Sequence, residues 1–157
     1  MSKIRIIFYI NLFISISVCI AIFLFSSQNG TESGRVSEGL TRKLFASFAS
    51  DEVIYFVEQI ARKIAHFTVY LVLGISAFFT YCSYKTGFTS DTPKKLKRII
   101  VPLLFCFFYS VTDEIHQFFV PGRNGTFTDC IIDSVGAFCG ILLGLLLICR
   151  SSLFKKD

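Results

Sequence analysis

The sequence predicts an all-α membrane protein with four transmembrane helices and with both termini in the cytoplasm. Of the 157 residues, 53% are hydrophobic and only 17% are charged, whereas an ordinary soluble domain is about 25% charged. The hydrophobic residues gather in four long runs, and most basic residues lie at one set of run ends. We therefore expect residues 1–157 to form a single membrane domain.

Each of the four runs has the length that a transmembrane helix needs. A bilayer core of about 30 Å is crossed by about 20 helical residues. The runs place the spans at about residues 4–25, 64–84, 99–120 and 130–149. A cleaved signal peptide is the alternative for the first run. A retained anchor is favoured because this run is longer than a typical signal core and no small-x-small cleavage site follows it.

The basic residues predict the orientation of the spans. Ten of the sixteen Lys and Arg residues lie on one side of the predicted membrane, namely Lys3, Arg5, Lys85, Lys94, Lys95, Lys97, Arg98, Arg150, Lys155 and Lys156. The positive-inside rule assigns this side to the cytoplasm, so the other two loops face outward. A nucleic-acid partner is not expected, because the basic residues form no stripe through a polar domain.

The first outer loop, residues 26–63, is too long and too patterned for a plain linker. Apolar residues recur every four positions over 36–48, which indicates an amphipathic helix able to lie on the outer leaflet or to cover the bundle. A second helical stretch is predicted to begin near Ser50 and Asp51, which can cap it, and to continue into the second span. The last outer loop is a tight turn at residues 121–125, where Pro121 ends the third span.

Three of the spans carry polar side chains on one face each. Helical spacing groups Arg62, His66, Tyr70 and Gly74 in the second span, Tyr109, Asp113, His116 and Gln117 with Glu114 adjacent in the third, and Asp129, Asp133, Gly136, Gly140 and Gly144 in the fourth. Counting about 1.5 Å per residue from the outward ends places these groups in the outer third of the membrane. Ionisable groups in lipid are costly and usually functional, so we expect the three faces to meet in one site.

The residue types suggest a division of roles within this site. Its candidate catalytic residues are His66, Asp113, Glu114, His116, Asp129 and Asp133. The two histidines are the expected proton donor and acceptor, with the carboxylates orienting them. Its candidate ligand-binding residues are Arg62, Lys63, Gln117 and Arg123, and the arginines suit an anionic phosphate or carboxylate. The alternative is a buried salt-bridge network that only fixes the register of the helices.

No cofactor and no metal are predicted. A divalent metal held by the histidines and carboxylates is a less favoured alternative, because the sequence contains no His-x-x-x-His or Glu-x-x-His spacing. No Ser or Cys stands in a nucleophile motif, so no particular reaction is indicated. The six cysteines lie in or beside apolar runs and are interpreted as packing residues. Gly136, Gly140 and Gly144 form a small-residue ridge that suits close helix packing and also a homo-oligomer.

Two segments together resemble the VanZ-like family of bacterial membrane proteins, named for a teicoplanin-resistance protein. They are 62-RKIAHFTVYLVLG-74 and 113-DEIHQFFVPGRNGTFTDCIIDSVGAFCG-140. The resemblance covers about residues 60–146, and the second segment is the more specific. The positions that match the family's motif are Arg62, Lys63, His66, Asp113, Glu114, His116, Gln117, Pro121, Gly122, Arg123, Asp129 and Asp133.

The resemblance implies a multi-pass protein of the bacterial cell membrane. Its founding member lowers susceptibility to lipid-tailed glycopeptide antibiotics. Together with the outer position of the charged groups, the resemblance favours a role at the outer leaflet on a membrane lipid, a lipid-linked anionic envelope component or a lipidated glycopeptide antibiotic. The alternative is a non-enzymatic membrane scaffold whose buried charges are structural. A proton-linked transporter is a weaker alternative, because the inner halves of the spans carry little beyond Ser and Thr, whereas proton relays need ionisable chains.

Overall fold

The computed structural model describes residues 2–28, 50–89, 94–123 and 125–150 of the chain. This part contains four α-helices and no strands: α1 (Lys3–Ser26), α3 (Asp51–Phe88), α4 (Lys95–Phe118) and α5 (Phe127–Arg150). All four are long and apolar enough to cross a membrane. The all-α fold with four membrane-spanning helices is therefore confirmed, and its orientation in the membrane stays a prediction.

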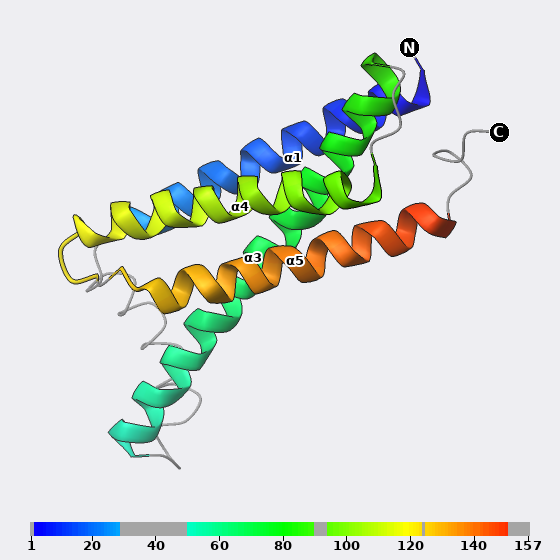
Figure 1. Cartoon of the computed structure of the whole chain (residues 1–157). Helices are drawn as coiled ribbons and strands as arrows, with labels where there is room; N and C mark the ends of the chain where they lie inside the picture. Colours follow the sequence, from blue (N-terminus) through cyan, green and yellow to red (C-terminus); the bar gives the residue numbers. More distant parts are fainter. Residues whose placement is uncertain (1, 29–49, 90–93, 124, 151–157) are drawn as a thin grey trace.

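The helices form a bundle in which α3 runs obliquely across the others (Figure 1). The start of α1, the end of α3, the start of α4 and the end of α5 lie at one end of the bundle. We call this the basic end, because it carries Lys3, Arg5, Lys85, Lys94, Lys95, Lys97 and Arg98. The opposite end holds the end of α1, the end of α4 and the start of α5, together with the first turns of α3 (Figure 1).

The second span is part of a much longer helix than its apolar run. Helix α3 has 38 residues, which corresponds to a length of about 57 Å, against a bilayer core of about 30 Å. Its first part therefore projects from the bundle (Figure 1). The helix begins at Asp51, as predicted, although the side chain of Ser50 makes no capping hydrogen bond. The amphipathic helix predicted for residues 36–48 lies outside the described residues.

Helix α4 ends before Pro121, at Phe118, two residues earlier than the predicted end of the third span. The backbone N–H of Phe119 bonds the carbonyl oxygen of His116, and that of Val120 bonds the carbonyl oxygen of Gln117. Each of these hydrogen bonds reaches back three residues instead of four, which tightens the last turn and ends the helix. The chain is therefore already turning when it reaches Pro121.

The closest packing in the bundle is between α3 and α5, which have the most extensive helix contact. A Cβ atom on Gly136 would overlap the carbonyl oxygen of Phe67, and one on Gly140 would overlap that of Leu71. Only glycine at these positions allows the two backbones to approach so closely. The glycine ridge thus packs against α3 within the chain, and association of copies through the same glycines stays a prediction.

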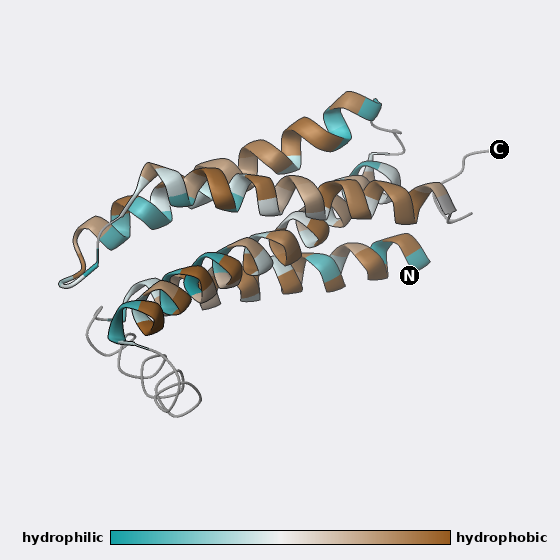
Figure 2. Cartoon of the chain, turned by 90° about the horizontal axis from the view of Figure 1, so that it is seen from below, coloured by the Kyte–Doolittle hydropathy of each residue, from teal (hydrophilic) through white to brown (hydrophobic). Residues whose placement is uncertain are grey.

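Apolar side chains lie both between the helices and on the outer surface of the bundle, as expected for a protein surrounded by lipid. Tyr70, Leu73 and Ala137 form part of a buried cluster between the helices, while large apolar side chains such as Phe13 and Phe108 are exposed on the outside. Figure 2 shows the hydrophobic residues along the length of the helices, with hydrophilic segments concentrated towards their ends. All six cysteines are free, in agreement with their interpretation as packing residues.

Candidate functional site

A network of polar side chains links α3, α4 and α1 at the end of the bundle opposite the basic end, and Gln117 is its centre. The Nη2 of Arg62 donates a hydrogen bond to Oε1 of Gln117 at 3.1 Å. The amide nitrogen of Gln117 faces Oδ2 of Asp113 at 2.9 Å, Oε1 of Glu114 at 3.3 Å and Oγ of Ser26 at 3.3 Å. One amide group therefore joins a cation on α3 to two carboxylates on α4.

The acidic members of this network are shielded from solvent. The exposed fraction is 5% for Asp113, 6% for Glu114, and 0% for both Gln117 and Asp133. A carboxylate in lipid is costly unless it is paired or hydrogen-bonded. The hydrogen bonds from Gln117 and its neighbours are therefore needed to keep these groups inside the bundle.

A second polar chain connects α3 to α5. Nδ1 of His66 lies 3.3 Å from Oδ1 of Asp133. The hydroxyl of Ser110 on α4 donates to Oδ2 of Asp133 at 2.7 Å. Although His66 is close enough for an ion pair, Oδ1 accepts no hydrogen bond among the described residues. Asp133 thus accepts a hydrogen bond from Ser110 at Oδ2, and its Oδ1 lies beside the imidazole nitrogen of His66.

The loop between α4 and α5 is fixed against the site by Glu114. Oε2 of this carboxylate accepts a hydrogen bond from the backbone N–H of Thr126 at 2.7 Å. At Gly125 a Cβ atom would overlap the carbonyl oxygen of Glu114, so the loop can lie this close only with glycine there. Glu114 therefore ties the end of α4 to the start of α5.

Arg123, predicted to bind a ligand, is hydrogen-bonded to the end of α1. Its Nε donates to the carbonyl oxygen of Gln28 at 3.0 Å, and its Nη2 donates to that of Phe25 at 2.7 Å. Cations are stabilised at helix C-termini, where carbonyl groups lack helical partners. Burial lowers the pKa of Arg123 from its ordinary value, yet a guanidinium stays charged at neutral pH.

The turn that carries Arg123 explains this placement. Gly122 has a φ of 75°, and the backbone N–H of Arg123 bonds the carbonyl oxygen of Val120 at 3.1 Å. Proline followed by a residue with positive φ is typical of a type II turn, which favours glycine at its third position. The Pro-Gly-Arg sequence therefore directs the guanidinium back onto the end of α1.

Besides Arg123, three predicted site residues make no side-chain hydrogen bond to this network within the described part of the chain, namely His116, Lys63 and Asp129. His116 stacks on Phe23 of α1, with ring centroids 4.8 Å apart, and its Nε2 lies 3.1 Å from Oγ of Ser27. The two histidines expected to act as a proton donor and acceptor thus have different partners on different helices. Lys63 is exposed, and Asp129 is half-buried in the first turn of α5.

Sequence reasoning missed several uncharged partners in the site, namely Ser26, Ser110 and the backbone of Thr126. One signal was present in the sequence, because Ser110 lies three residues before Asp113 and so on the same side of the helix. The other two lie at the end of α1 and in a loop. Their contacts depend on how the helices pack, which helical spacing does not reveal.

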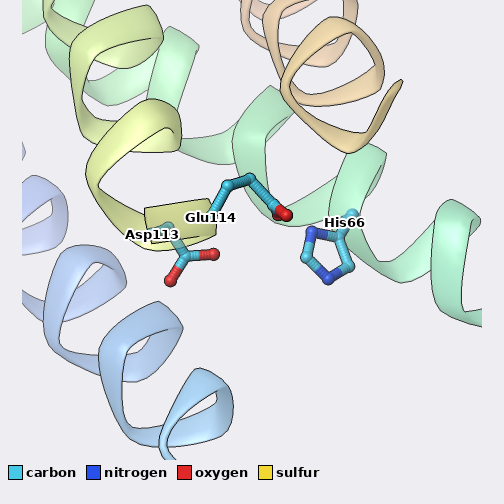
Figure 3. Close-up of side chains that lie close together, drawn as sticks. All are labelled: His66, Asp113 and Glu114. Atoms are coloured by element: carbon cyan, nitrogen blue, oxygen red, sulfur yellow. The ribbon is translucent and has the colours of Figure 1, made fainter. Parts of the chain in front are cut away.

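One part of the site also has the donor set of a metal centre. His66, Asp113 and Glu114 each offer one ligand atom, and these atoms all lie within 4.8 Å of one another. Figure 3 shows Asp113 and Glu114 extending from α4 towards the ring of His66 on α3. Imidazole nitrogen combined with carboxylate oxygen is suitable for several divalent metals.

The stretch of chain that contains these polar residues matches a known family. The model of the VanZ/LLP1 family matches residues 10–148, which extends well beyond the 60–146 region of the quoted motifs towards the N-terminus. No curated protein and no solved structure gives a match. Since the family model covers most of the chain and all four membrane-spanning helices, this membrane protein belongs to the VanZ/LLP1 family.

Proposed function

We propose that the protein acts at the outer leaflet of the bacterial cell membrane on an amphiphilic anionic molecule, either a lipid-linked envelope component or a lipidated glycopeptide antibiotic of the teicoplanin type. One observation carries the proposal: the carboxylates Asp113, Glu114 and Asp133 are buried beside His66 and Arg62 inside membrane-spanning helices. Buried ionisable groups of this kind usually mark functional sites in membrane proteins.

The orientation in this proposal comes from the basic end. Seven Lys and Arg residues are placed at one end of the bundle by the described helices, and clusters of this kind remain in the cytoplasm. The polar network lies at the other end of the same helices. An outward-facing site follows if the positive-inside rule holds for this chain.

Among the described residues, Arg62 and Lys63 are the best placed cations for an anionic head group. The described contact of Arg62 uses one of its nitrogens, towards Gln117, so further donors of the guanidinium are available for a phosphate or carboxylate. Lys63 is exposed next to it. We assign Arg123 a supporting role, because two of its nitrogens bond the carbonyl oxygens of α1.

The surface beside Lys63 suits an acyl chain. The projecting part of α3 exposes Val53, Phe56 and Ile60, and Ile64 continues this stripe. On an ideal helix the stripe lies on the side of α3 opposite Arg62 and closer to Lys63, so an amphiphile can place its apolar chain along the stripe and its charged group at Lys63. This arrangement would explain a preference for glycopeptides that carry a lipid tail over those that lack one.

The test compares both glycopeptide types in a Gram-positive host that expresses the chain. We expect reduced susceptibility to a lipid-tailed glycopeptide and unchanged susceptibility to a tail-less one. Arg62→Gln should return the host to its original susceptibility at equal membrane abundance, whereas Lys97→Gln, at the exposed basic end, should behave as the unsubstituted chain. Equal protection by the unsubstituted chain and Arg62→Gln would contradict the proposal.

A non-enzymatic scaffold is the second candidate, and the internal hydrogen bonds favour it. Glu114 is bonded to Thr126, and Asp113 is bonded to Gln117, as expected for charges that only hold helices together. Glu114→Gln separates the two functions because it preserves the size of the side chain and an acceptor for Thr126. A scaffold keeps its phenotype with this substitution, whereas a site that needs the carboxylate loses it at unchanged abundance.

A further inference from the structure

We propose that His66, Asp113 and Glu114 bind one divalent transition-metal ion of the Zn²⁺ or Mn²⁺ type, with Asp133 placed beside His66. The inference goes beyond the proposed function and does not depend on it. The sequence did not predict a metal, because the ligands come from two helices and show no short metal-binding spacing. Packing of α3 against α4 brings them together.

The distances are close to those of a metal site. Zn²⁺ binds nitrogen and oxygen ligands at about 2.0–2.2 Å, so adjacent ligands of a tetrahedral ion lie about 3.3 Å apart. The ligand atoms of His66, Asp113 and Glu114 lie within 4.8 Å of one another. Rotations that move the carboxylate oxygens by about 1 Å would bring them into this range.

Asp133 provides an independent observation that points to a ligand. Its side chain is fully buried, and its Oδ1 accepts no hydrogen bond among the described residues. This oxygen lies 3.3 Å from Nδ1 of His66. A buried carboxylate oxygen without a hydrogen bond is costly. A cation bound at His66 would lie near this oxygen and would offset its cost through its charge.

Each of the three carboxylates is also oriented by a hydrogen bond from the protein. Gln117 donates to Asp113, the backbone N–H of Thr126 donates to Glu114, and Ser110 donates to Asp133. Metal-binding carboxylates are typically oriented by outer-shell hydrogen bonds of this kind. These donors hold the carboxylates in place, and Figure 3 shows Asp113 and Glu114 on the side of α4 that faces His66.

The charge balance favours a cation in the same place. Asp113, Glu114 and Asp133 are all buried. Among the described residues, Arg62 is the only Lys or Arg hydrogen-bonded into their network, because Arg123 bonds the carbonyl oxygens of α1. Arg123 still interacts electrostatically with Asp113 and Glu114, but three carboxylates outnumber the two guanidinium groups, so an excess of negative charge remains in a region of low dielectric. A divalent ion would neutralise it.

The experiment uses the full chain purified in detergent, stripped with a chelator and titrated calorimetrically with Zn²⁺ or Mn²⁺. We expect one saturable site. Asp113→Asn and Glu114→Gln preserve side-chain size and should each weaken binding by more than about tenfold. Glu52→Gln, an exposed carboxylate in the first turn of α3, should leave the affinity unchanged. Size-exclusion chromatography confirms that each variant is folded.

A second measurement does not depend on any variant. Pulsed electron paramagnetic resonance of Mn²⁺ bound to the unsubstituted chain should show coupling to a ¹⁴N nucleus, and His66→Gln should remove it. The metal site is overturned if neither metal shows a saturable site. It is also overturned if Asp113→Asn and Glu114→Gln bind the metal with the same affinity as the unsubstituted chain. Bound Mn²⁺ without ¹⁴N coupling does the same. Because no antibiotic is present, these outcomes leave the glycopeptide test independent.

Discussion

The two ends of the bundle carry charge in opposite ways. At the basic end, Lys3, Arg5 and Lys97 are exposed where helices begin, and the described contacts of Arg5 are a hydrogen bond to the carbonyl of Gly87 and a cation–π contact with Phe88. At the other end, Asp113 and Asp133 are buried inside the spans and held by hydrogen bonds from Gln117 and Ser110.

This difference separates two uses of ionisable residues in a membrane protein. Exposed cations at helix ends cost little and can set orientation through their sign alone. Buried carboxylates require partners in defined positions, so their neighbours are as important as the charges themselves. Substitutions at the two ends should therefore differ greatly in their effects.

The largest difference is expected for Gln117, which joins Arg62 to Asp113 and Glu114. Gln117→Leu keeps a similar volume but leaves three buried or half-buried groups without this partner, at a cost of about 3 kcal/mol or more. Lys97→Ala at the basic end should cause no measurable loss. Thermal unfolding in detergent, followed by circular dichroism, gives both values. A Tm for Gln117→Leu equal to that of the parent would contradict the role of the network.

Glycine substitutions should give the next largest contrast. In Gly140→Ala the new methyl group meets the backbone of Leu71, which cannot move without separating α3 from α5, so a loss of about 1–3 kcal/mol is expected. In Gly87→Ala, near the basic end, the new methyl group meets a methyl group of the Ile4 side chain at 3.1 Å. That side chain can move, and alanine favours the helix. Comparable losses of Tm in the two variants would show that the contact between α3 and α5 is not especially close.

The smallest contrast concerns two arginines that both tie α1 to another part of the chain. Arg123→Gln removes two hydrogen bonds from a half-buried guanidinium to carbonyl oxygens of α1, and should cost about 1–2 kcal/mol. Arg5→Gln removes one hydrogen bond from an exposed guanidinium and should cost less. Hydrogen exchange at the last turn of α1, measured by mass spectrometry, should increase only in Arg123→Gln. An equal increase in Arg5→Gln would exclude a local effect.

The fold was largely predictable from length and hydrophobicity, since each span appears as an apolar run. The end of α4 was misplaced because Pro121 was expected to stop the helix, whereas hydrogen bonds to His116 and Gln117 close it at Phe118. The full length of α3 was indicated by the helical stretch predicted from Asp51. Such boundaries depend on local hydrogen bonds that hydrophobicity does not record.

The site was predictable where helical spacing alone determines the position of a side chain. Asp113 and Gln117 lie one turn apart and point into the same network. His116 is adjacent to Gln117 on the helix surface, and its contact with Phe23 depends on where α1 packs. The hydrogen bonds of Arg123 to α1 could not be predicted for a related reason, because its direction is set by the conformation of the turn at Gly122.

The most direct measurement asks which end of the bundle faces outward. Gln28→Cys at the end of α1 and Thr89→Cys at the end of α3 place a thiol at opposite ends, and the unsubstituted chain gives the background from the native cysteines. A membrane-impermeant maleimide added to intact cells should label Gln28→Cys, and Thr89→Cys only after permeabilisation. Labelling of Thr89→Cys alone on intact cells would place the buried network at the cytoplasmic face and contradict an outer-leaflet site.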